Sequence, residues 1–209
     1  MCTRFYIEPH SALQRIIEKA QHSSLANQMN VSLAKPLTMV GELRPTDVAA
    51  AIAPNKEGKP AVFPMLWGFS HEATSAPIVN CRIETACQKN LWKDSWFRRR
   101  CIIPCSWYFE WEHHIVNGKK QTGTKYAIQP QGSELTYLAG LYRFEERKGI
   151  QIPVFAVLTR EPSESVKGLH DRMPAIFSRA DIGSWVKPDG NPEAVSRQAL
   201  TEMCVERAT

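Results

Sequence analysis

The second residue of the chain carries the most specific chemistry in the sequence. Cys2 follows Met1 directly, and a residue as small as cysteine at this position permits removal of the initiator methionine. The α-amine and the thiol would then lie on adjacent carbons, with ordinary pKa values of about 7.7–8.0 and about 8.5, so both are partly nucleophilic near neutral pH. Such an aminothiol condenses with an aldehyde to an imine, and the thiolate then closes a five-membered thiazolidine ring. The simpler interpretation is that Cys2 is only the residue after the initiator.

A carboxylate between two aromatic residues is the second candidate. Glu110 lies between Phe109 and Trp111 in an apolar segment. If its carboxyl faces the interior, desolvation raises its pKa and suits it to move protons near neutral pH. Alternation along a strand also allows Glu110 to face solvent beside Tyr108 and Glu112. The sequence leaves both orientations open.

Two further segments contain side chains suited to proton transfer and anion binding. His170 lies in a predicted helix-to-strand connection and can titrate at physiological pH, although a surface histidine paired with its neighbours accounts for it too. Asn80 can orient a carbonyl or hydroxyl group, and Arg82 can bind phosphate through paired hydrogen bonds. The segment 80–85 also fits the start of a capped helix.

Basic and aromatic residues are interleaved over residues 89–100. This composition suits single-stranded nucleic acid, because cations bind phosphates and rings stack on bases. An amphipathic helix with Trp92 and Trp96 in the core explains the tryptophans better. The basic run 98–100 keeps the nucleic-acid interpretation open.

Zinc and nucleotide chemistry find little support in the sequence. Cys101, Cys105, His113 and His114 are of the residue types that bind zinc, but zinc sites take such pairs from turns, whereas 102–104 is typical of a strand. Gly-x-Ser-x-Gly, Walker and Gly-x-Gly-x-x-Gly motifs are absent from the sequence, which argues against serine hydrolases and nucleotide-binding proteins. We therefore expect no metal and no cofactor.

The elements that must position these residues follow from hydrophobic periodicity. Apolar residues at 13, 16, 17 and 20 predict a helix over 11–20, with Ser11 as its cap. Prolines and polar residues predict loops and short strands over 21–60, and 61–69 predicts a strand. Further strands are predicted over 101–104, 107–112, 125–129, 135–144, 150–159 and 175–177, with hairpin turns at Asn117-Gly118 and Lys148-Gly149. Helices are predicted over 163–169, 181–186 and 193–204. Together they predict one α+β domain over 1–209, with an antiparallel barrel-like β core flanked by short helices.

Composition limits the class of protein. The 209 residues are 43% hydrophobic and 22% charged, which is typical of a globular domain and excludes disorder, collagen-like repeats and a coiled coil. The net charge of +5 mildly favours a polyanionic partner. The chain lacks an apolar run of the ~20 residues that cross a membrane, and its start lacks the apolar region of a signal peptide. We therefore expect a cytoplasmic protein, with no membrane partner, whose cysteines stay reduced.

Taken in order, these motifs resemble those of one protein family. They are Met1-Cys2-Thr3-Arg4-Phe5, Trp67-Gly68, Asn80-Cys81-Arg82-Ile83-Glu84-Thr85, Arg100-Cys101-Ile102-Ile103-Pro104, Phe109-Glu110-Trp111 and His170-Asp171-Arg172-Met173-Pro174. The series is similar to that of the SRAP family, the SOS response-associated peptidases, over most of the chain. The resemblance implies the SRAP fold and the processing of abasic sites in DNA. It further implies capture of the ring-opened aldehyde in single-stranded DNA as a thiazolidine with the N-terminal cysteine, together with autopeptidase and lyase-type activities.

The resemblance also implies a role for each candidate residue. Cys2 would be the covalent nucleophile, and Glu110 the acid–base group for imine formation and ring closure. His170 would help to open the deoxyribose, and Asn80 would hold Cys2 and the sugar in place. The DNA-binding residues implied by the resemblance are Arg4 and Arg82 on the phosphates, with Trp67 and Trp111 shaping the pocket.

The chain departs from the family pattern at several positions. Thr3 stands where the family usually has glycine, and Cys81 where it has alanine. The segment 107–111 replaces a Gly-Phe-Tyr-Glu-Trp stretch. Glu42, in the segment 41–45, stands where an asparagine is expected in a region that contacts DNA.

Two other functions remain open. In a thiol peptidase, Cys2, His170 and Glu110 would act on a peptide bond, whereas a non-covalent binder of single-stranded DNA would need no nucleophile. A crosslinking protein needs the aldehyde of an abasic site, a plain binder needs only single-stranded DNA, and a peptidase needs neither. We expect a monomer in each case.

Overall fold

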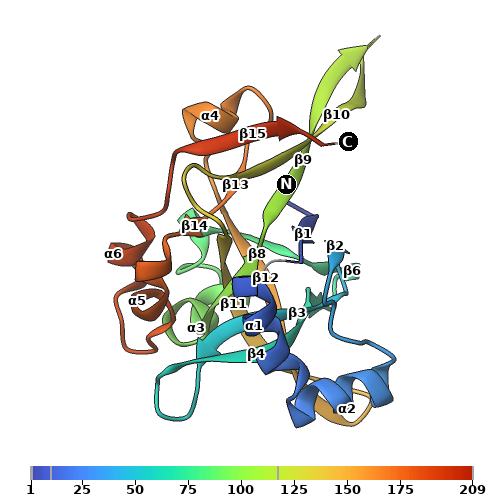
Figure 1. Cartoon of the computed structure of the whole chain (residues 1–209), viewed down its shortest axis with the longest axis vertical. Coiled ribbons are helices and arrows are strands. Elements are labelled where there is room, and N and C mark those ends of the chain that lie inside the picture. The colour runs from blue at the N-terminus through green and yellow to red at the C-terminus, as the bar shows by residue number, and fades with distance from the viewer. Residues whose placement is uncertain (1, 10, 117, 209) are drawn as a thin grey trace.

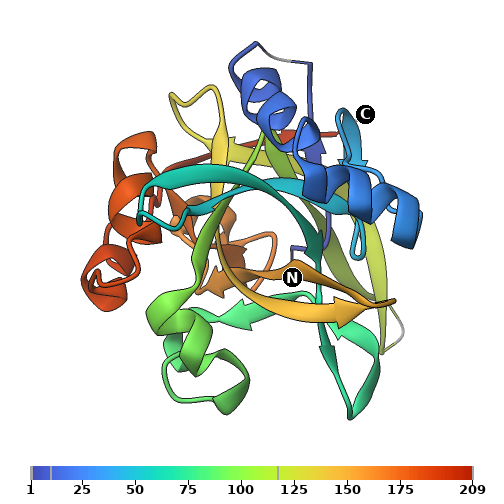
Figure 2. The same ribbon diagram turned by 90° about the horizontal axis from the view of Figure 1, so that it is seen from below.

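Five strands form a closed barrel at the centre of the molecule (Figure 1). The computed structural model describes residues 2–9, 11–116 and 118–208. The barrel strands are β3 (Val48–Pro54), β4 (Pro60–Trp67), β8 (Arg100–Cys105), β11 (Thr136–Arg147) and β12 (Ile150–Arg160). They pair in the order β12–β4–β3–β8–β11, and a further pairing of β11 with β12 closes the ring, as Figure 2 shows.

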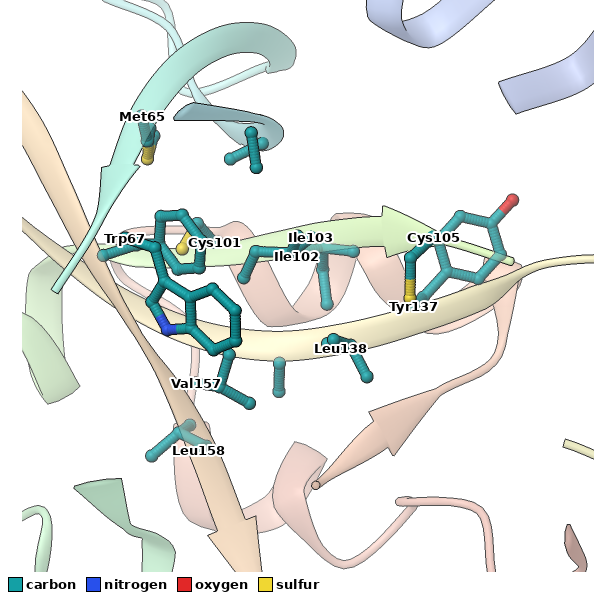
Figure 3. Packing of buried hydrophobic residues seen from close by; sticks show 14 of the residues in the cluster. Met65, Trp67, Cys101, Ile102, Ile103, Cys105, Tyr137, Leu138, Val157 and Leu158 are labelled. Atoms are coloured by element: carbon teal, nitrogen blue, oxygen red, sulfur yellow. The ribbon is translucent and has the colours of Figure 1, made fainter. Parts of the chain in front are cut away.

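The barrel confirms the predicted fold class and adds one parallel contact. Neighbouring strands run antiparallel, except that β4 and β12 pair in parallel through Leu66 with Val154 and Trp67 with Phe155. Every residue of β8 is buried, because one face of the strand lines the barrel and the other is covered. Figure 3 shows buried side chains on both faces of β4, β8, β11 and β12, which belong to one hydrophobic cluster.

A second sheet covers the barrel and contains the N-terminal strand. Its order is β15–β10–β9–β1–β2, with the bounds β1 (Phe5–Ile7), β2 (Gly41–Leu43), β9 (Trp107–Val116), β10 (Lys119–Pro130) and β15 (Met203–Arg207). The β9–β10 hairpin extends beyond the barrel (Figure 1). Of its predicted turn, Asn117 lies outside the described residues. The predicted turn at Lys148-Gly149 is confirmed, since both residues have positive φ between β11 and β12.

The helices pack around the barrel. They are α1 (Ser11–Gln21), α2 (Ser24–Leu33), α3 (Asn90–Arg98), α4 (Glu164–Lys167), α5 (Ile182–Val186) and α6 (Pro192–Ser196). Short elements complete the fold: β5 (Phe69–His71), β6 (Thr74–Ile78), β7 (Asn80–Arg82), β13 (Met173–Pro174), β14 (Ile176–Phe177) and the 3-10 turns Ile83–Thr85 and Arg179–Asp181. In the described parts of the chain, none of the helices is long and apolar enough to span a membrane.

Three predictions of elements were wrong. The segment 21–60 contains the helix α2, whose cap Ser23 accepts a hydrogen bond from the Ala26 amide. The segment 80–85 begins as the strand β7 rather than as a capped helix, because it pairs with β12. The predicted helix over 193–204 ends at Ser196, and Cys204 lies in β15, which pairs with β10 over five residue pairs.

The basic segment 89–100 is mostly structural. Trp92 and Trp96 are buried in the core, as the amphipathic-helix interpretation predicts. Arg99 pairs with Asp94. Arg100 is 1% exposed and donates hydrogen bonds to three backbone carbonyls. The nucleic-acid interpretation of this run is therefore wrong for Arg100.

Candidate active site

Cys2 lies three residues before the start of β1. Its side chain is fully buried. The Asn80 amide donates a 2.9 Å hydrogen bond from Nδ2 to the Cys2 carbonyl, and the Cys2 thiol donates to the Arg4 carbonyl at 3.8 Å. The Phe109 amide of β9 donates to the same Arg4 carbonyl at 2.9 Å. The start of the chain is thus fixed to β7 on one side and to β9 on the other.

Glu110 projects inward from β9 and is 3% exposed. Tyr108, two residues earlier, shares this face of the strand and is fully buried, so the solvent-facing orientation of Glu110 is wrong. Burial raises the pKa of the Cys2 thiol well above its ordinary value, and the negative charge of Glu110 adds to this effect. The thiol is therefore protonated in this state, and Glu110 is close enough to influence its ionisation.

Asn80 reaches the site from β7, which runs parallel to β12. Its Nδ2 is used by Cys2, whereas its Oδ1 is buried and lacks a hydrogen-bond partner among the described residues. Buried acceptors in proteins nearly always have partners. Oδ1 is therefore available to accept a hydrogen bond from a group that enters the site.

His170 is brought to β9 by the segment between α4 and β13. Its side chain is 8% exposed, and its ring meets that of His113, on β9, edge to face at 5.9 Å. Nδ1 lies 3.0 Å from the Arg172 amide and 2.8 Å from the Asp171 carboxylate. Nδ1 can accept from the amide only when it carries no proton, and it can pair with the carboxylate of Asp171, which is 84% exposed, only when it does.

The cations of the site gather around Glu42 on β2. Its carboxylate lies 3.1 Å from Arg4, 3.2 Å from Arg44 and 2.7 Å from Lys125. Burial tends to raise the pKa of Glu42, but the hydrogen bond and charge of Lys125, together with Arg44, outweigh it and lower that pKa. Arg4, predicted to bind phosphate, is therefore engaged by an internal anion. Arg82, the other predicted phosphate ligand, is exposed at the end of β7.

The two predicted tryptophans occupy different environments. Trp67 is fully buried between Phe5, at 4.8 Å, and Phe155, at 5.9 Å between ring centroids, so it has no surface for contact with DNA. Trp67 can influence the shape of the proposed DNA pocket only by supporting the residues that cover it. Trp111 is half-buried, with the Lys125 ammonium 5.5 Å from its ring.

Several of the predicted residues therefore lie close together, and the structure adds residues that the sequence did not indicate. Cys2, Asn80 and Glu110 are brought together, and His170 is placed beside β9. Tyr108 and the Glu42 network were missed, although alternation along β9 already placed Tyr108 on the same face as Glu110. The residues considered for zinc are separated: Cys101 and Cys105 are buried in β8, while His114 is exposed. Within the described parts of the chain, no three His, Cys, Asp or Glu side chains are arranged to hold a metal.

The fold and site define a barrel protein whose thiol lies at its N-terminal strand. The family model described as "SOS response associated peptidase (SRAP)" matches residues 1–208. The chain belongs to this family.

Curated relatives share part of this chain. It is 30% identical over 128 residues to the abasic site processing protein YoaM of Bacillus subtilis, covering 58% of this chain and 55% of YoaM. It is 24% identical over 139 residues to the abasic site processing protein YedK of Escherichia coli, covering 66% and 60% of the two chains. The chain thus spans little more than half the length of these relatives.

Solved structures share the fold over the full chain. A protein from Bacteroides thetaiotaomicron superposes with a TM-score of 0.76 at 18% identity, covering 100% of this chain and 92% of that one. A protein from Bordetella bronchiseptica gives a TM-score of 0.68, also at 18% identity, with full coverage of both chains. At such identity the likeness establishes the barrel architecture.

Proposed function

We propose that this protein processes abasic sites in DNA by covalent capture of their aldehyde at Cys2. The observation that carries the proposal is the fixed position of Cys2 at the start of β1, held by Asn80 and faced by Glu110. The names of the curated relatives, all abasic site processing proteins, support the substrate class. The net charge of +5 is compatible with DNA as the partner.

The reaction requires the α-amine of Cys2, which removal of Met1 would free; Met1 itself lies outside the described residues. The amine adds to the C1′ aldehyde of the ring-opened sugar to give a carbinolamine. Glu110 supplies a proton to the departing hydroxyl, which leaves as water, and a protonated imine remains. The Glu110 carboxylate then receives the Cys2 thiol proton and is restored to its acid form. The thiolate attacks the carbon of the protonated imine, whose nitrogen keeps its proton, and this completes the neutral thiazolidine with net loss of one water.

The remaining groups serve the sugar and its flanking phosphates. His170 would move a proton at the ring oxygen when the deoxyribose opens, and the unused Oδ1 of Asn80 would accept a hydrogen bond from the amine or the sugar. Arg4 and Arg82 would bind phosphates of a single strand. Trp111 offers a half-buried ring beside them, and Trp67 supports the pocket floor.

The first test is covalent capture by protein whose loss of Met1 has been confirmed by intact mass. We expect a denaturation-resistant adduct with single-stranded DNA that contains one abasic site, and none with undamaged DNA. Cys2→Ala should abolish the adduct without a change in melting temperature, whereas the matched Cys204→Ala in β15 should retain it. Glu110→Gln should slow capture by roughly 100-fold, the usual contribution of general acid–base catalysis.

Two results would contradict the proposal. An undiminished adduct from Cys2→Ala would remove the nucleophile from the scheme. DNA binding that is lost at high salt, survives Cys2→Ala and never becomes covalent would identify a plain single-strand binder.

We also propose that the autopeptidase and lyase-type activities use this site. When extra residues precede Cys2, its thiol would attack the preceding carbonyl and the peptide C–N bond would break, giving a thioester and the free Cys2 amine. Water would then hydrolyse the thioester and release the preceding segment, with His170 and Glu110 moving protons. As a general thiol peptidase the site is poorly suited, because burial raises the pKa of Cys2, whereas peptidases lower it with a paired imidazole. Incubation with unrelated peptides in the absence of DNA separates the two: cleavage would favour the peptidase.

A further inference from the structure

Tyr108 is the most conspicuous buried polar group that the proposed reaction leaves unused. Its side chain is fully buried, and its hydroxyl has no hydrogen-bond partner among the described residues. An unsatisfied buried hydroxyl is costly, so native proteins rarely retain one without a reason. A partner is therefore expected in a state of the protein other than the resting one.

The position of Tyr108 indicates which partner this is. Tyr108 and Glu110 share the inward face of β9, and Tyr108 is paired with Phe5 of β1, three residues after Cys2. Burial raises the pKa of Tyr108, and the charges of Cys2 and Glu110 raise it further. The phenol therefore lies within electrostatic reach of both reacting groups and remains a protonated donor.

The ionisable groups around Cys2 come from three elements. Glu110 and Tyr108 come from β9, Cys105 from β8, and Arg4 from the chain before β1. Burial, followed by the charge of Cys2, raises the pKa of Cys105 far above its ordinary value, so Cys105 is neutral. The Arg4 guanidinium is engaged with Glu42. Tyr108 is thus the neutral hydroxyl donor at the base of the site.

The hydrogen bond that the Cys2 thiol makes in this structure cannot stabilise the Cys2 thiolate. The thiol donates its proton to the Arg4 carbonyl, and a carbonyl can only accept. Once the proton has moved to Glu110, the sulfur becomes an acceptor and needs a donor. A thiolate left without one in a buried site would be strongly disfavoured.

We propose that Tyr108 is a positioning residue that donates a hydrogen bond to the Cys2 thiolate during ring closure. The inference rests on the proposed function, because it concerns the same nucleophile. Tyr108 keeps its own proton throughout: the thiol proton goes to Glu110, which replaces the proton that Glu110 gave to the departing hydroxyl. Tyr108 thus stabilises the thiolate and directs its lone pair without taking part in proton transfer.

The test is the pH dependence of Cys2 reactivity in Tyr108→Phe. Alkylation by iodoacetamide is followed at the Cys2 peptide by mass spectrometry, using protein that has lost Met1. A hydrogen bond to a charged group should shift the apparent pKa of the thiol by about one to two units, so at every pH below the midpoint Tyr108→Phe should be alkylated about 10-fold or more slowly than the wild-type protein. Below the midpoint, crosslinking to abasic DNA should slow by about 10-fold or more. Tyr142→Phe, which alters a buried phenol of β11 beside Cys101, is the matched control and should leave both profiles unchanged.

Stability separates this role from a structural one. Because the hydroxyl is unsatisfied, its removal should leave the melting temperature unchanged or slightly higher. A lower melting temperature with a superimposable alkylation profile would overturn the proposal, as would superimposable profiles alone. If the wild-type protein forms no adduct while Tyr108→Phe still slows the alkylation of Cys2, the DNA function fails and the role of Tyr108 stands.

Discussion

Glu42 neutralises only part of the charge that surrounds it. One carboxylate contacts Arg4, Arg44 and Lys125, so the cluster retains a net positive charge beside the site. In the proposed complex, a DNA phosphate that binds Arg4 would compete with this carboxylate. Glu42 would therefore weaken phosphate binding while it holds the three cations in place.

Glu42→Gln should strengthen binding to single-stranded DNA by about 3- to 10-fold at low salt, with a smaller gain at high salt, because exposed charges are screened. Fluorescence anisotropy over a salt series measures this. Since the pKa of Glu42 is lowered, its carboxylate stays charged below the ordinary value of about 4.3, so the gain should persist throughout mildly acidic pH. Glu57→Gln, which alters an acid paired with Lys59 on the β3–β4 turn, is the control. Unchanged or weaker binding would show that Glu42 acts by organising the cations.

The types of most site residues could be predicted from the sequence, but their environments could not. Cys2 and Asn80 are found by their motifs, and the burial of Glu110 was one of two open orientations. The resemblance placed Trp67 among the DNA-binding residues as one that shapes the pocket, but it could not indicate that Trp67 is fully buried where β4 meets β12 and is covered by Phe5. Which face of a strand is covered depends on how distant segments of the chain pair and pack. The periodicity of a single strand does not reveal these pairings.

At the scale of elements, the β11–β12 hairpin contains a turn that a single substitution should stabilise. Lys148 and Gly149 both have positive φ, 49° and 78°, as a two-residue type I′ turn requires. Glycine adopts this conformation freely, whereas lysine is strained there. A residue that favours positive φ at the first turn position should therefore stabilise the turn more than Lys148 does.

Lys148→Asn should raise the free energy of unfolding by about 0.5 kcal/mol, because asparagine is the favoured residue at this turn position. Urea denaturation measures the change. Gly149→Ala, next to it, should destabilise the protein, since alanine does not readily adopt a φ of 78°. A destabilised Lys148→Asn would mean that the lysine side chain has a stabilising contact of its own.

The strands were easier to predict than the two ends of the chain. Four barrel strands, β4, β8, β11 and β12, have apolar runs between clear turns and could be predicted directly, whereas β3 lies in the segment 21–60, for which only loops and short strands were predicted. In α2, Asn27 and Asn30 are poor helix formers, and the helix is stabilised by the burial of Ala26 and Met29 against the rest of the protein. Residues 203–207 form a strand because β10 offers an unpaired edge, which local sequence does not reveal.

For the molecule as a whole, Arg100 joins two helices to the barrel. From β8, its Nε donates to the Trp185 carbonyl of α5 and its Nη1 to the Trp96 carbonyl of α3, each at 2.7 Å, and its Nη2 donates to the Lys187 carbonyl. Burial lowers the pKa of Arg100 to about 10, against the opposing charge of Asp189. The guanidinium therefore remains charged at neutral pH.

Arg100→Met should destabilise the protein by about 3 kcal/mol or more, because three carbonyls lose their donor in a dry interior. Thermal and urea unfolding measure this. The control Arg98→Met, at the exposed end of α3, should change stability by less than about 0.5 kcal/mol. Equal losses in both variants would assign the effect to the charge of the segment instead of to the buried contacts.

The parallel pairing of β4 with β12 also sets an order of events in time. It joins residues that are far apart in the chain through only two residue pairs, and such distant contacts form late because closing a long loop costs entropy. Trp67 lies on this seam, and Phe5 of β1 packs against it. In a chain that is still folding, the segment before β1 would therefore lack its partners on β7 and β9, so the arrangement around Cys2 would be complete only when the last strands of the barrel have met.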